Sequence, residues 1–321
     1  MSRFLGVDGG GTKTAFALID SESGVLARSQ QASSDYYALG VEAVTRTFAD
    51  GVDDICRQAG MAPDAIAFTV VGLPGYGEVS ADQAALDAIP RPALGHDRFL
   101  CVNDMVPGWA GSLGAADGIN VIGGTGSMTY GERDGAGLRV GGWGELFGDE
   151  GSGYWIADRG LNAFTRMSDG RLPRGPLYDL VKERTGIAHD LDLIGLVLTD
   201  WQKQRTRIAA LSSTVAEAAT AGDPVAADIL AAAGVELAGL VEATRRQLGF
   251  QEDEQVAVSY SGGVFRADGV LQAFTGELGR LHAGYDLRAP LYEPDVGAAL
   301  YAAKVSGAPL TADALGSLPR R

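Results

Sequence analysis

The segment GVDGGGTKT, residues 6–14, combines residue types that bind phosphate groups. It begins as an apolar strand, ends that strand in the carboxylate of Asp8, and continues with three glycines and Thr12. Glycines leave backbone N–H groups free to converge on phosphate oxygens, and a threonine hydroxyl adds a donor. A carboxylate beside such a loop suits Mg²⁺, which proteins usually hold through waters and one or two carboxylates. The segment therefore predicts a phosphate loop with a metal ion near Asp8; the alternative is an ordinary glycine-rich hairpin turn.

Two common nucleotide-binding patterns do not fit this loop. The P-loop pattern GxxxxGK[ST] is absent, because Gly11 is followed by Thr12 rather than by lysine. The dinucleotide pattern needs a helix after the turn, whereas AFALID, residues 15–20, is typical of a strand. Neither of these two folds is therefore expected around the loop.

A second loop of the same kind, IGGTGSM, occupies residues 122–128. Each loop closes the first strand of a series of three strands joined by turns, beginning near residue 3 and again near residue 118. A repeat of this length indicates two similar domains. Facing loops from two domains would hold a polyphosphate from both sides, which suits phosphoryl transfer by positioning and electrostatics. The alternative is that both loops are ordinary hairpins.

A further carboxylate, Asp104, ends the apolar strand RFLCVND, residues 98–104. A general base would lie at such a strand end, next to the bound ligand. It would accept a hydroxyl proton during phosphoryl transfer, an effect of roughly 10²–10⁴-fold. The alternative is that Asp104 caps the helix expected to open near residues 103–104.

The segment GGWGELFGDEGSGYWIA, residues 141–157, contains two tryptophans, an Asp–Glu pair and six glycines. Amides and carboxylates suit the hydroxyl groups of a small polar ligand, and tryptophan suits the face of a sugar. The same segment is typical of a helix start capped by Asp149 or Ser152, and the two interpretations are compatible.

Two stretches of small residues stand beside expected helix starts, AEAATAGDP at 216–224 and YSGGVF at 260–265. Small side chains let the backbone pass close to a flat ligand such as adenine. The alternative for each stretch is a tight turn without a ligand.

The charge balance limits the possible partners. The 321 residues include 26 lysines and arginines against 41 aspartates and glutamates, a net charge of −15. Nucleic acids and anionic membranes both need a basic surface, so neither is an expected partner. We find no signal-type apolar region and no run of roughly 18 apolar residues. A cytoplasmic protein is expected, with Cys56 and Cys101 as buried thiols.

The periodicity of apolar residues predicts an α/β chain in which the candidate residues lie at strand ends and helix starts. Strands are expected at 4–8, 15–20, 25–31, 65–75, 98–104, 118–124, 127–133, 137–143 and 255–260. Helices are expected at 41–59, 81–89, 152–167, 177–185, 207–221, 224–248 and 294–304. The boundary between the two repeats is expected near residues 113–118.

Taken together, these motifs resemble the BadF/BadG-type ATPase family of the sugar kinase, hsc70 and actin superfamily, particularly its N-acetylglucosamine kinases. The most specific stretch is 141–157, followed by the two glycine loops in order and spacing. The resemblance implies two ribonuclease-H-like, actin-like ATPase domains with a ligand cleft between them. The first would be 1–115, joined by a returning helix at about 293–305, and the second 116–292.

The resemblance also implies a role for individual residues in an enzyme that uses ATP and Mg²⁺ to phosphorylate the 6-hydroxyl of an amino sugar. Asp104 would be the base and a sugar contact, and Asp8 would lie near the metal ion. The phosphates and adenosine would contact Gly10, Gly11, Thr12, Thr125, Gly126, Ala219, Gly262 and Gly263. The sugar would contact Asp35, Tyr36, Ser127, Met128, Gly142, Trp143, Gly144 and Asp149.

One departure from the family pattern bears on the substrate. The loop after the third strand, SSDYYALG, has Asp35 where the family's kinases usually have asparagine. A carboxylate there could favour the ammonium group of glucosamine over the acetamide of N-acetylglucosamine, or could simply contact a ring hydroxyl as asparagine would.

Other functions within the family stay open as alternatives. Activators of 2-hydroxyacyl-CoA dehydratases share the ATP loops but hold an iron–sulfur cluster through cysteines, and the two cysteines of this chain are in other segments. A sugar-sensing protein that has lost the chemistry is a third hypothesis, which the intact Asp104 and loops oppose. A homodimer is common for such folds.

Overall fold

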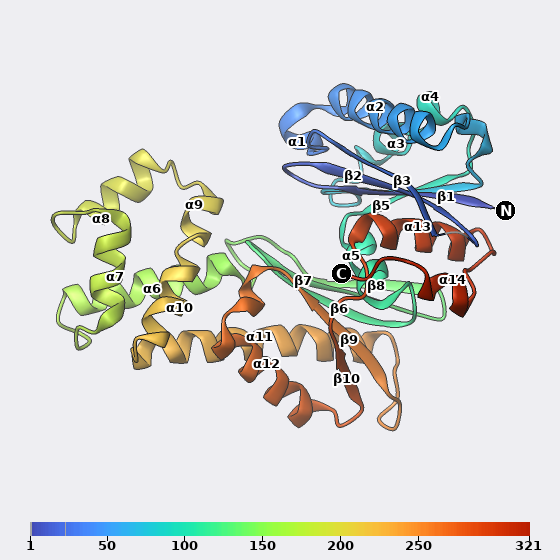
Figure 1. Ribbon diagram of the computed structural model, residues 1–321. Helices are drawn as coiled ribbons and strands as arrows, with labels where there is room; N and C mark the ends of the chain where they lie inside the picture. The colour runs from blue at the N-terminus through green and yellow to red at the C-terminus, as the bar shows by residue number, and fades with distance from the viewer. Residues whose placement is uncertain (1, 23) are drawn as a thin grey trace. The chain divides into compact units, whose positions relative to one another are not determined.

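A computed structural model describes residues 2–22 and 24–321, and the chain divides into two compact units (Figure 1). Unit 1 comprises the residues up to Asp117 together with Ala289–Arg321. Unit 2 is the continuous segment Gly118–Arg288. Each unit is α/β and is built around one five-stranded sheet.

The sheet of unit 1 has the strand order β3-β2-β1-β4-β5. Its strands are β1 (Arg3–Gly9), β2 (Thr14–Asp20), β3 (Gly24–Gln31), β4 (Phe68–Leu73) and β5 (Phe99–Asn103). The first three are antiparallel, as the short turns predict, and β4 and β5 run parallel to β1. The carboxyl ends of β1, β4 and β5 therefore lie at one edge of the sheet, where Asp8 and Asp104 are found.

Unit 2 repeats this topology in the order β10-β9-β6-β7-β8. Its strands are β6 (Gly118–Gly123), β7 (Ser127–Arg133), β8 (Ala136–Gly141), β9 (Val256–Ser261) and β10 (Tyr285–Arg288). Again three antiparallel strands are followed by two parallel ones. The predicted internal repeat is confirmed, and the shared topology is that of ribonuclease-H-like domains.

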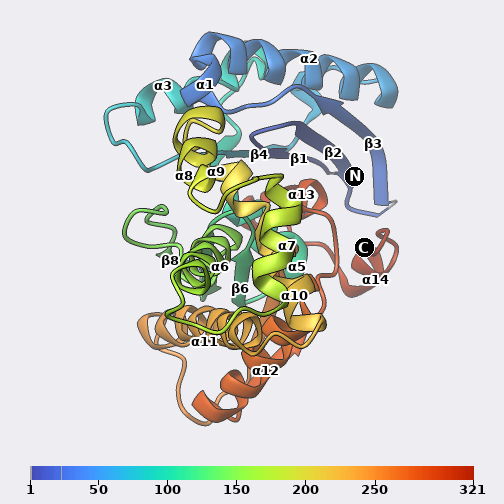
Figure 2. The same ribbon diagram turned by 90° about the vertical axis from the view of Figure 1, so that its left-hand side faces the viewer.

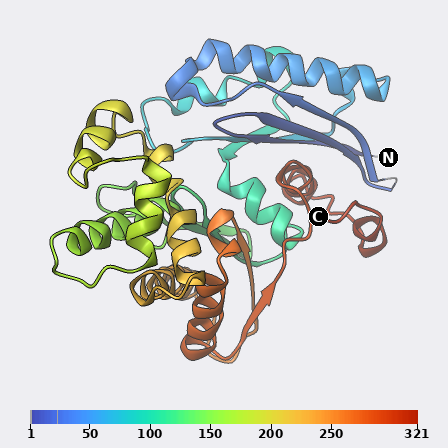
Figure 3. The same ribbon diagram turned by 60° about the vertical axis from the view of Figure 1, so that its left-hand side comes forward.

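Helix α2 (Val41–Ala59) covers one face of the unit 1 sheet, and α13 (Pro294–Val305) and α5 (Met105–Leu113) cover the other (Figures 1, 2 and 3). The apolar positions at 3- and 4-residue steps in α2 are buried, as predicted: Val44, Phe48, Val52 and Ile55. The remaining helices of unit 1 are short: α1 (Tyr36–Leu39), η1 (Pro63–Ala65), α3 (Gln83–Asp87), α4 (Arg91–Leu94) and α14 (Ala312–Gly316).

Glycines allow α13 to lie directly against its neighbours. A Cβ atom on Gly6 of β1 would overlap the backbone of Asp295 and Ala299 in α13. A Cβ atom on Gly297 would overlap the backbone of Gly111 in α5. These positions tolerate no side chain, because backbone cannot move aside as the end of a flexible side chain can.

Helices α11 (Pro224–Gln247) and α12 (Asp268–Leu281) pack side by side in unit 2, and α11 contacts strands β6, β7 and β8 (Figure 1). A second group of helices lies beside them (Figure 2): α6 (Gly153–Ser168), α7 (Pro176–Thr185), α8 (Asp192–Gly195), η2 (Leu196–Asp200), α9 (Arg205–Ala209) and α10 (Ser212–Thr220). A short 3₁₀ turn, η3 (Gly263–Arg266), follows β9. By length and composition α11 could cross a membrane, but Leu230, Leu237 and Val241 on it belong to the core of unit 2.

Three expectations need correction. The helix predicted at 207–221 is two helices, α9 and α10, because the amide of Leu211 bonds to the carbonyl of Ile208 in a tighter turn. The helix predicted at 81–89 is only the five residues of α3. Strand β10 was not predicted. Its four residues, YDLR, contain no apolar run, and none of them is fully buried.

An ionic cluster closes the C-terminal end of α11. The carboxylate of Glu242 accepts hydrogen bonds from Arg245 (2.9 and 3.0 Å), Arg246 (2.6 Å) and Tyr285 (2.7 Å). Arg245 is 2% exposed and Glu242 5% exposed, and Arg245 also pairs with the exposed carboxylate of Glu252 (2.9 Å). Burial acts to raise the pKa of Glu242, but these donors outweigh it and lower the pKa from 4.5 to about 2.

We predict that Glu242→Gln lowers the free energy of unfolding by about 3 kcal/mol at pH 7, because it removes the buried one of the two carboxylates that pair with the Arg245 guanidinium and leaves only Glu252. The depressed pKa makes this contribution fully present above pH 4.5 and lost as the pH falls towards 2. Urea denaturation at pH 7 and pH 3 measures it. Glu236→Gln, an exposed position on the same helix, is the control. Equal stability of the two variants would contradict the prediction.

Candidate active site

The first glycine loop lies between β1 and β2 and is bonded to the segment before α1. The carbonyl of Gly10 accepts hydrogen bonds from the amide of Ser34 (3.2 Å) and the hydroxyl of Ser33 (3.1 Å). The Ser33 hydroxyl also accepts a bond from the amide of Asp35 (3.1 Å). The structure thus brings Gly10 and Asp35 together, and Thr12 beside them is exposed.

Asp35 has a structural role that the sequence analysis did not identify. Its carboxylate is the N-cap of α1 and accepts hydrogen bonds from the amides of Tyr37 (3.1 Å) and Ala38 (3.4 Å). Both bonds use the same oxygen, Oδ1. Tyr36 is buried and stacks on Tyr37 with 4.2 Å between the ring centroids.

Asp8 lies in an acidic environment at the carboxyl edge of the unit 1 sheet. Burial, together with the neighbouring charges of Asp104 and Asp295, raises its pKa to about 8, while Lys13 acts in the opposite direction. A pocket of about 700 Å³ is lined by Asp8, Lys13 and Asp295, among others. The ligand-free protein therefore favours the protonated form of Asp8 to a much higher pH than an exposed carboxyl group would.

The donor set around Asp8 fits Mg²⁺ held mainly by water and phosphate oxygens. Among residues 2–22 and 24–321, no group of three or more His, Cys, Asp or Glu side chains could hold a metal ion. Mg²⁺ often binds through one or two carboxylates, several waters and the phosphates of its substrate. One carboxylate in a negative environment is sufficient for that mode.

Asp104 directly precedes α5, but it does not cap the helix: within the described residues its side chain accepts no bond from the first amides of α5. The carboxamide of the neighbouring Asn103 takes that place, accepting from the amide of Met105 (3.3 Å) and donating to the carbonyl of Tyr76 (3.0 Å). The capping alternative for Asp104 is therefore wrong.

The second glycine loop, between β6 and β7, is bonded to the start of α6. The carbonyl of Gly124 accepts from the amide of Gly153 (2.8 Å), and the carbonyl of Thr125 from that of Tyr154 (3.2 Å). The Ser127 hydroxyl donates to the carbonyl of Glu150 (2.6 Å). Gly124, Thr125 and Gly263 line one pocket of about 390 Å³, so the loop and part of the expected adenosine end come together.

The segment 142–149 is joined to the same loop through Asp149. Asp149 is 2% exposed, and its carboxylate lies against Gly126 of the loop. Burial raises the pKa of Asp149, while Arg205 and the backbone of Ser127 and Gly144 act to lower it. The amide of Gly142 donates to the carbonyl of Ser127 (2.9 Å). Trp143 is 73% exposed. The structure thus gathers Ser127, Gly142, Gly144 and Asp149 from two segments.

The cap of α6 is settled by a single bond. The Ser152 hydroxyl accepts from the amide of Trp155 (3.1 Å), so Ser152 rather than Asp149 caps this helix. Asp149 is free of that task and pairs with Arg205 of α9 instead. Sequence reasoning missed Arg205, because a single arginine in a helical stretch matches no motif.

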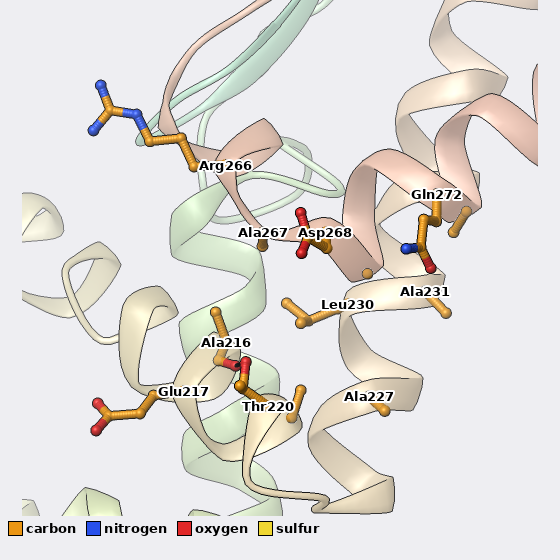
Figure 4. A pocket seen from close by; sticks show the side chains of 13 residues that line it. Ala216, Glu217, Thr220, Ala227, Leu230, Ala231, Arg266, Ala267, Asp268 and Gln272 are labelled. Atoms are coloured by element: carbon orange, nitrogen blue, oxygen red, sulfur yellow. Dashed lines mark hydrogen bonds between the residues drawn. The ribbon is translucent and has the colours of Figure 1, made fainter.

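Ala219 lines a separate pocket of about 610 Å³ between α10, α11 and α12 (Figure 4). Arg266, Asp268 and Gln272 also border it. Gly262 and Gly263 do not line this pocket. Gly262 has φ +98°, and a Cβ atom on it would overlap the backbone of Gly123, so the position requires glycine.

The fold and these sites agree with the comparison with known proteins. The chain belongs to the BadF/BadG/BcrA/BcrD ATPase family, whose model matches residues 5–302. It is 28% identical over 310 residues to N-acetyl-D-glucosamine kinase of Dictyostelium discoideum, covering 93% of this chain and 97% of that protein. It is 28% identical over 241 residues to glucosamine kinase GspK of Vibrio cholerae, covering 74% and 79%.

A solved structure shares the fold. It is a Chromobacterium violaceum protein provisionally identified as an N-acetylglucosamine kinase, with a TM-score of 0.71 and 27% sequence identity. The match covers 94% of this chain and 99% of that one. The actin-like ATPase fold expected from the sequence is therefore confirmed.

We predict that Asp8→Asn stabilises the ligand-free protein at pH 8.5 by at least about 1 kcal/mol, the equivalent of one pKa unit. The native state holds the Asp8 proton more tightly than the unfolded chain, so wild-type stability falls as the pH rises from 3.8 towards 8. Asparagine removes that loss, and the difference should narrow as the pH is lowered to 5.

Denaturant unfolding at a series of pH values measures this difference. Asp53→Asn, at an exposed position of α2, serves as the control. A constant difference between wild type and Asp8→Asn across the series would show that Asp8 titrates normally.

Proposed function

We propose that this chain is an ATP-dependent kinase that phosphorylates the 6-hydroxyl of an amino sugar, with N-acetylglucosamine as the first choice and N-acetylglucosamine 6-phosphate as the product. The observation that carries the proposal is that the second glycine loop is joined to the segment 142–149, by the hydrogen bond from the amide of Gly142 to the carbonyl of Ser127 (2.9 Å) and by the packing of Asp149 against Gly126. A phosphate-type loop and a polar, tryptophan-containing loop then form one assembly. The sugar kinases named among its relatives support the same conclusion.

We assign Asp104 the role of the general base. It accepts the proton of the sugar 6-hydroxyl while that oxygen attacks the terminal phosphorus of ATP, the bond to the bridging oxygen breaks, and ADP leaves. Mg²⁺ near Asp8 neutralises charge on the phosphate oxygens when it is bound. Asp8 would hold the metal ion through its ionised carboxylate, since a positive charge would offset the burial and the acidic neighbours that raise its pKa.

We assign the other residues either to ATP or to the sugar. Backbone and hydroxyl groups of Gly10, Gly11, Thr12, Thr125 and Gly126 hold the phosphates of ATP, and Ala219, Gly262 and Gly263 hold its adenosine end. The sugar contacts Asp35, Tyr36, Ser127, Met128, Gly142, Trp143, Gly144 and Asp149. The pocket beside Ala219 has room for adenine, since about 610 Å³ is within the usual range of small-molecule sites.

The net charge of −15 supports a reaction without nucleic acid or membrane partners. Both cysteines are free and buried, as expected from the sequence, which fits a reducing cytoplasmic location. The same burial opposes the activator hypothesis, because Cys56 and Cys101 lie inside the core around α2 and cannot share a cluster with a second subunit. A homodimer is compatible with the proposal.

Glucosamine is the second candidate substrate, and Asp35 is the observation that favours it. Both hydrogen bonds that cap α1 use one oxygen of Asp35, so the other oxygen is not engaged in the cap. A coupled ADP-release assay with glucose, glucosamine, N-acetylglucosamine and N-acetylmannosamine tests the proposal. ADP release that no amino sugar stimulates would overturn it.

We predict that Asp104→Asn lowers kcat by at least about 10²-fold while the affinities for sugar and ATP are kept, because only proton transfer is lost. Steady-state kinetics and calorimetric titration measure the two effects. Asp64→Asn, at an exposed position of the same unit, is the control and should keep full turnover. Wild-type turnover in Asp104→Asn would remove the base assignment.

We predict that Asp35→Asn shifts the ratio of kcat/KM towards N-acetylglucosamine by on the order of tenfold, since an ammonium group loses a charge-assisted hydrogen bond. Asparagine caps helices as well as aspartate does, so α1 is preserved and only the charge changes. Kinetics with both sugars measure the ratio. An unchanged ratio would mean that Asp35 does not select the substrate and that the selection lies near Trp143 or Asp149.

A further inference from the structure

Arg205 is the one cation placed against the buried carboxylate of Asp149 in the described part of unit 2. It lies at the start of α9, and its guanidinium pairs with Asp149 and with Glu145 (3.3 Å). Asp149 is 2% exposed, whereas the Arg205 side chain is 38% exposed. One face of the guanidinium therefore meets the buried carboxylate and another remains accessible to a ligand.

The same guanidinium lies against the second glycine loop. A Cβ atom on Gly126 would overlap Nη2 of Arg205 and would come within 2.8 Å of Oδ2 of Asp149. The absence of a side chain at residue 126 thus allows the ion pair to pack on the loop backbone. The family resemblance implies that Gly126 contacts phosphate, and the structure adds a second reason for glycine there.

Asp149 connects three segments that are distant in sequence. It belongs to the 142–149 segment, its carboxylate pairs with Arg205 of α9, and the same carboxylate lies against Gly126 of the loop. A carboxylate has about four acceptor sites and the Arg205 bond occupies one of them, which leaves acceptor capacity for a sugar hydroxyl. Loss of the Arg205 donor would leave the carboxylate buried without a counter-charge.

We propose that Arg205 is a positioning residue for sugar binding: it fixes the Asp149 carboxylate between the second glycine loop and the segment 142–149, so that the remaining acceptor site of Asp149 meets a sugar hydroxyl. This inference rests on the proposed amino-sugar kinase function. Arg205 acts through Asp149, and Glu145 holds the outer side of the guanidinium in place.

The pH dependence of kcat/KM for the sugar should depend on the Arg205–Asp149 pair. Asp149 faces two charged groups, Arg205 and Glu145; burial raises its pKa, Arg205 lowers it, and Glu145 raises it. Removing Arg205 therefore moves the pKa of Asp149 upward. Because the ionised carboxylate is the form that accepts from the sugar, the acid limb of kcat/KM for the sugar should move to higher pH in Arg205→Met.

The test compares wild type with Arg205→Met, Arg205→Lys and Arg207→Met. Arg207 is an exposed residue of the same helix and provides the matched control. We expect Arg205→Met to raise KM for the sugar about tenfold, the effect of losing a charged hydrogen-bond partner, with a smaller change in KM for ATP. Lysine should restore part of the loss, since it keeps the charge but lacks the planar, five-donor guanidinium of arginine.

Two results would overturn the inference: a sugar KM and acid limb in Arg205→Met that equal those of wild type, or a rise confined to KM for ATP, which would make Arg205 a phosphate contact. Amide hydrogen exchange of the full chain gives a readout that needs no activity. Faster exchange at Ser127 and Gly144 in Arg205→Met, but not in Arg207→Met, supports the inference, and unchanged exchange contradicts it. If wild type phosphorylates no amino sugar, the proposed function fails while the exchange result still decides whether Arg205 fixes Asp149.

Discussion

The packing of unit 1 depends on three places where backbone meets backbone without an intervening side chain. Gly6, Gly111 and Gly297 let α13 approach β1 and α5 so closely that a single methyl group would overlap main-chain atoms. Main-chain atoms are fixed by the hydrogen bonds of the strand and the helices, so they cannot yield. Strand β1 is held in the centre of its sheet by β2 and β4, with α13 packed on it, and it carries Asp8 to the carboxyl edge.

The two units share one topology but place different side chains at their first turn. In unit 1 this turn follows Asp8, whose pKa is raised by burial and then by Asp104 and Asp295. In unit 2 the residue at the matching place is Ile122, and the cation Arg205 lies against the glycine loop instead. The acidic edge suits a metal ion and a base, and the edge rich in amides suits anionic phosphate. One fold has thus been given two complementary chemical roles.

The sequence was most informative where a pattern has a direct physical cause. Helix α2 was predicted with its observed bounds because its apolar residues recur at 3- and 4-residue steps, and the two glycine loops were found because each ends an apolar strand. Strand β10 was missed because a short, half-buried edge strand has no apolar run.

Tertiary contacts account for what the sequence could not predict at the candidate site. The capping role of Asp35 was missed because α1 is a single turn of four residues, and Arg205 because its partner Asp149 is 56 residues away. The role of Asn103 in capping α5 was hidden for a similar reason: either of two adjacent polar residues could have served, and only the fold shows which one turns back to the helix.

The assembly of unit 1 from two distant stretches of chain has a consequence for biosynthesis. Residues up to Asp117 emerge from the ribosome before unit 2, but α13, which covers one face of their sheet, is not made until residues 294–305. Synthesis proceeds at about 5–20 residues per second, so the apolar surface on β1 stays exposed for roughly ten seconds or more before its partner helix is made. Unit 2 is a continuous segment and can complete its own core during that interval. The later unit in sequence is therefore the first to finish folding, and the nascent first sheet is the part of the chain that a chaperone would need to shield.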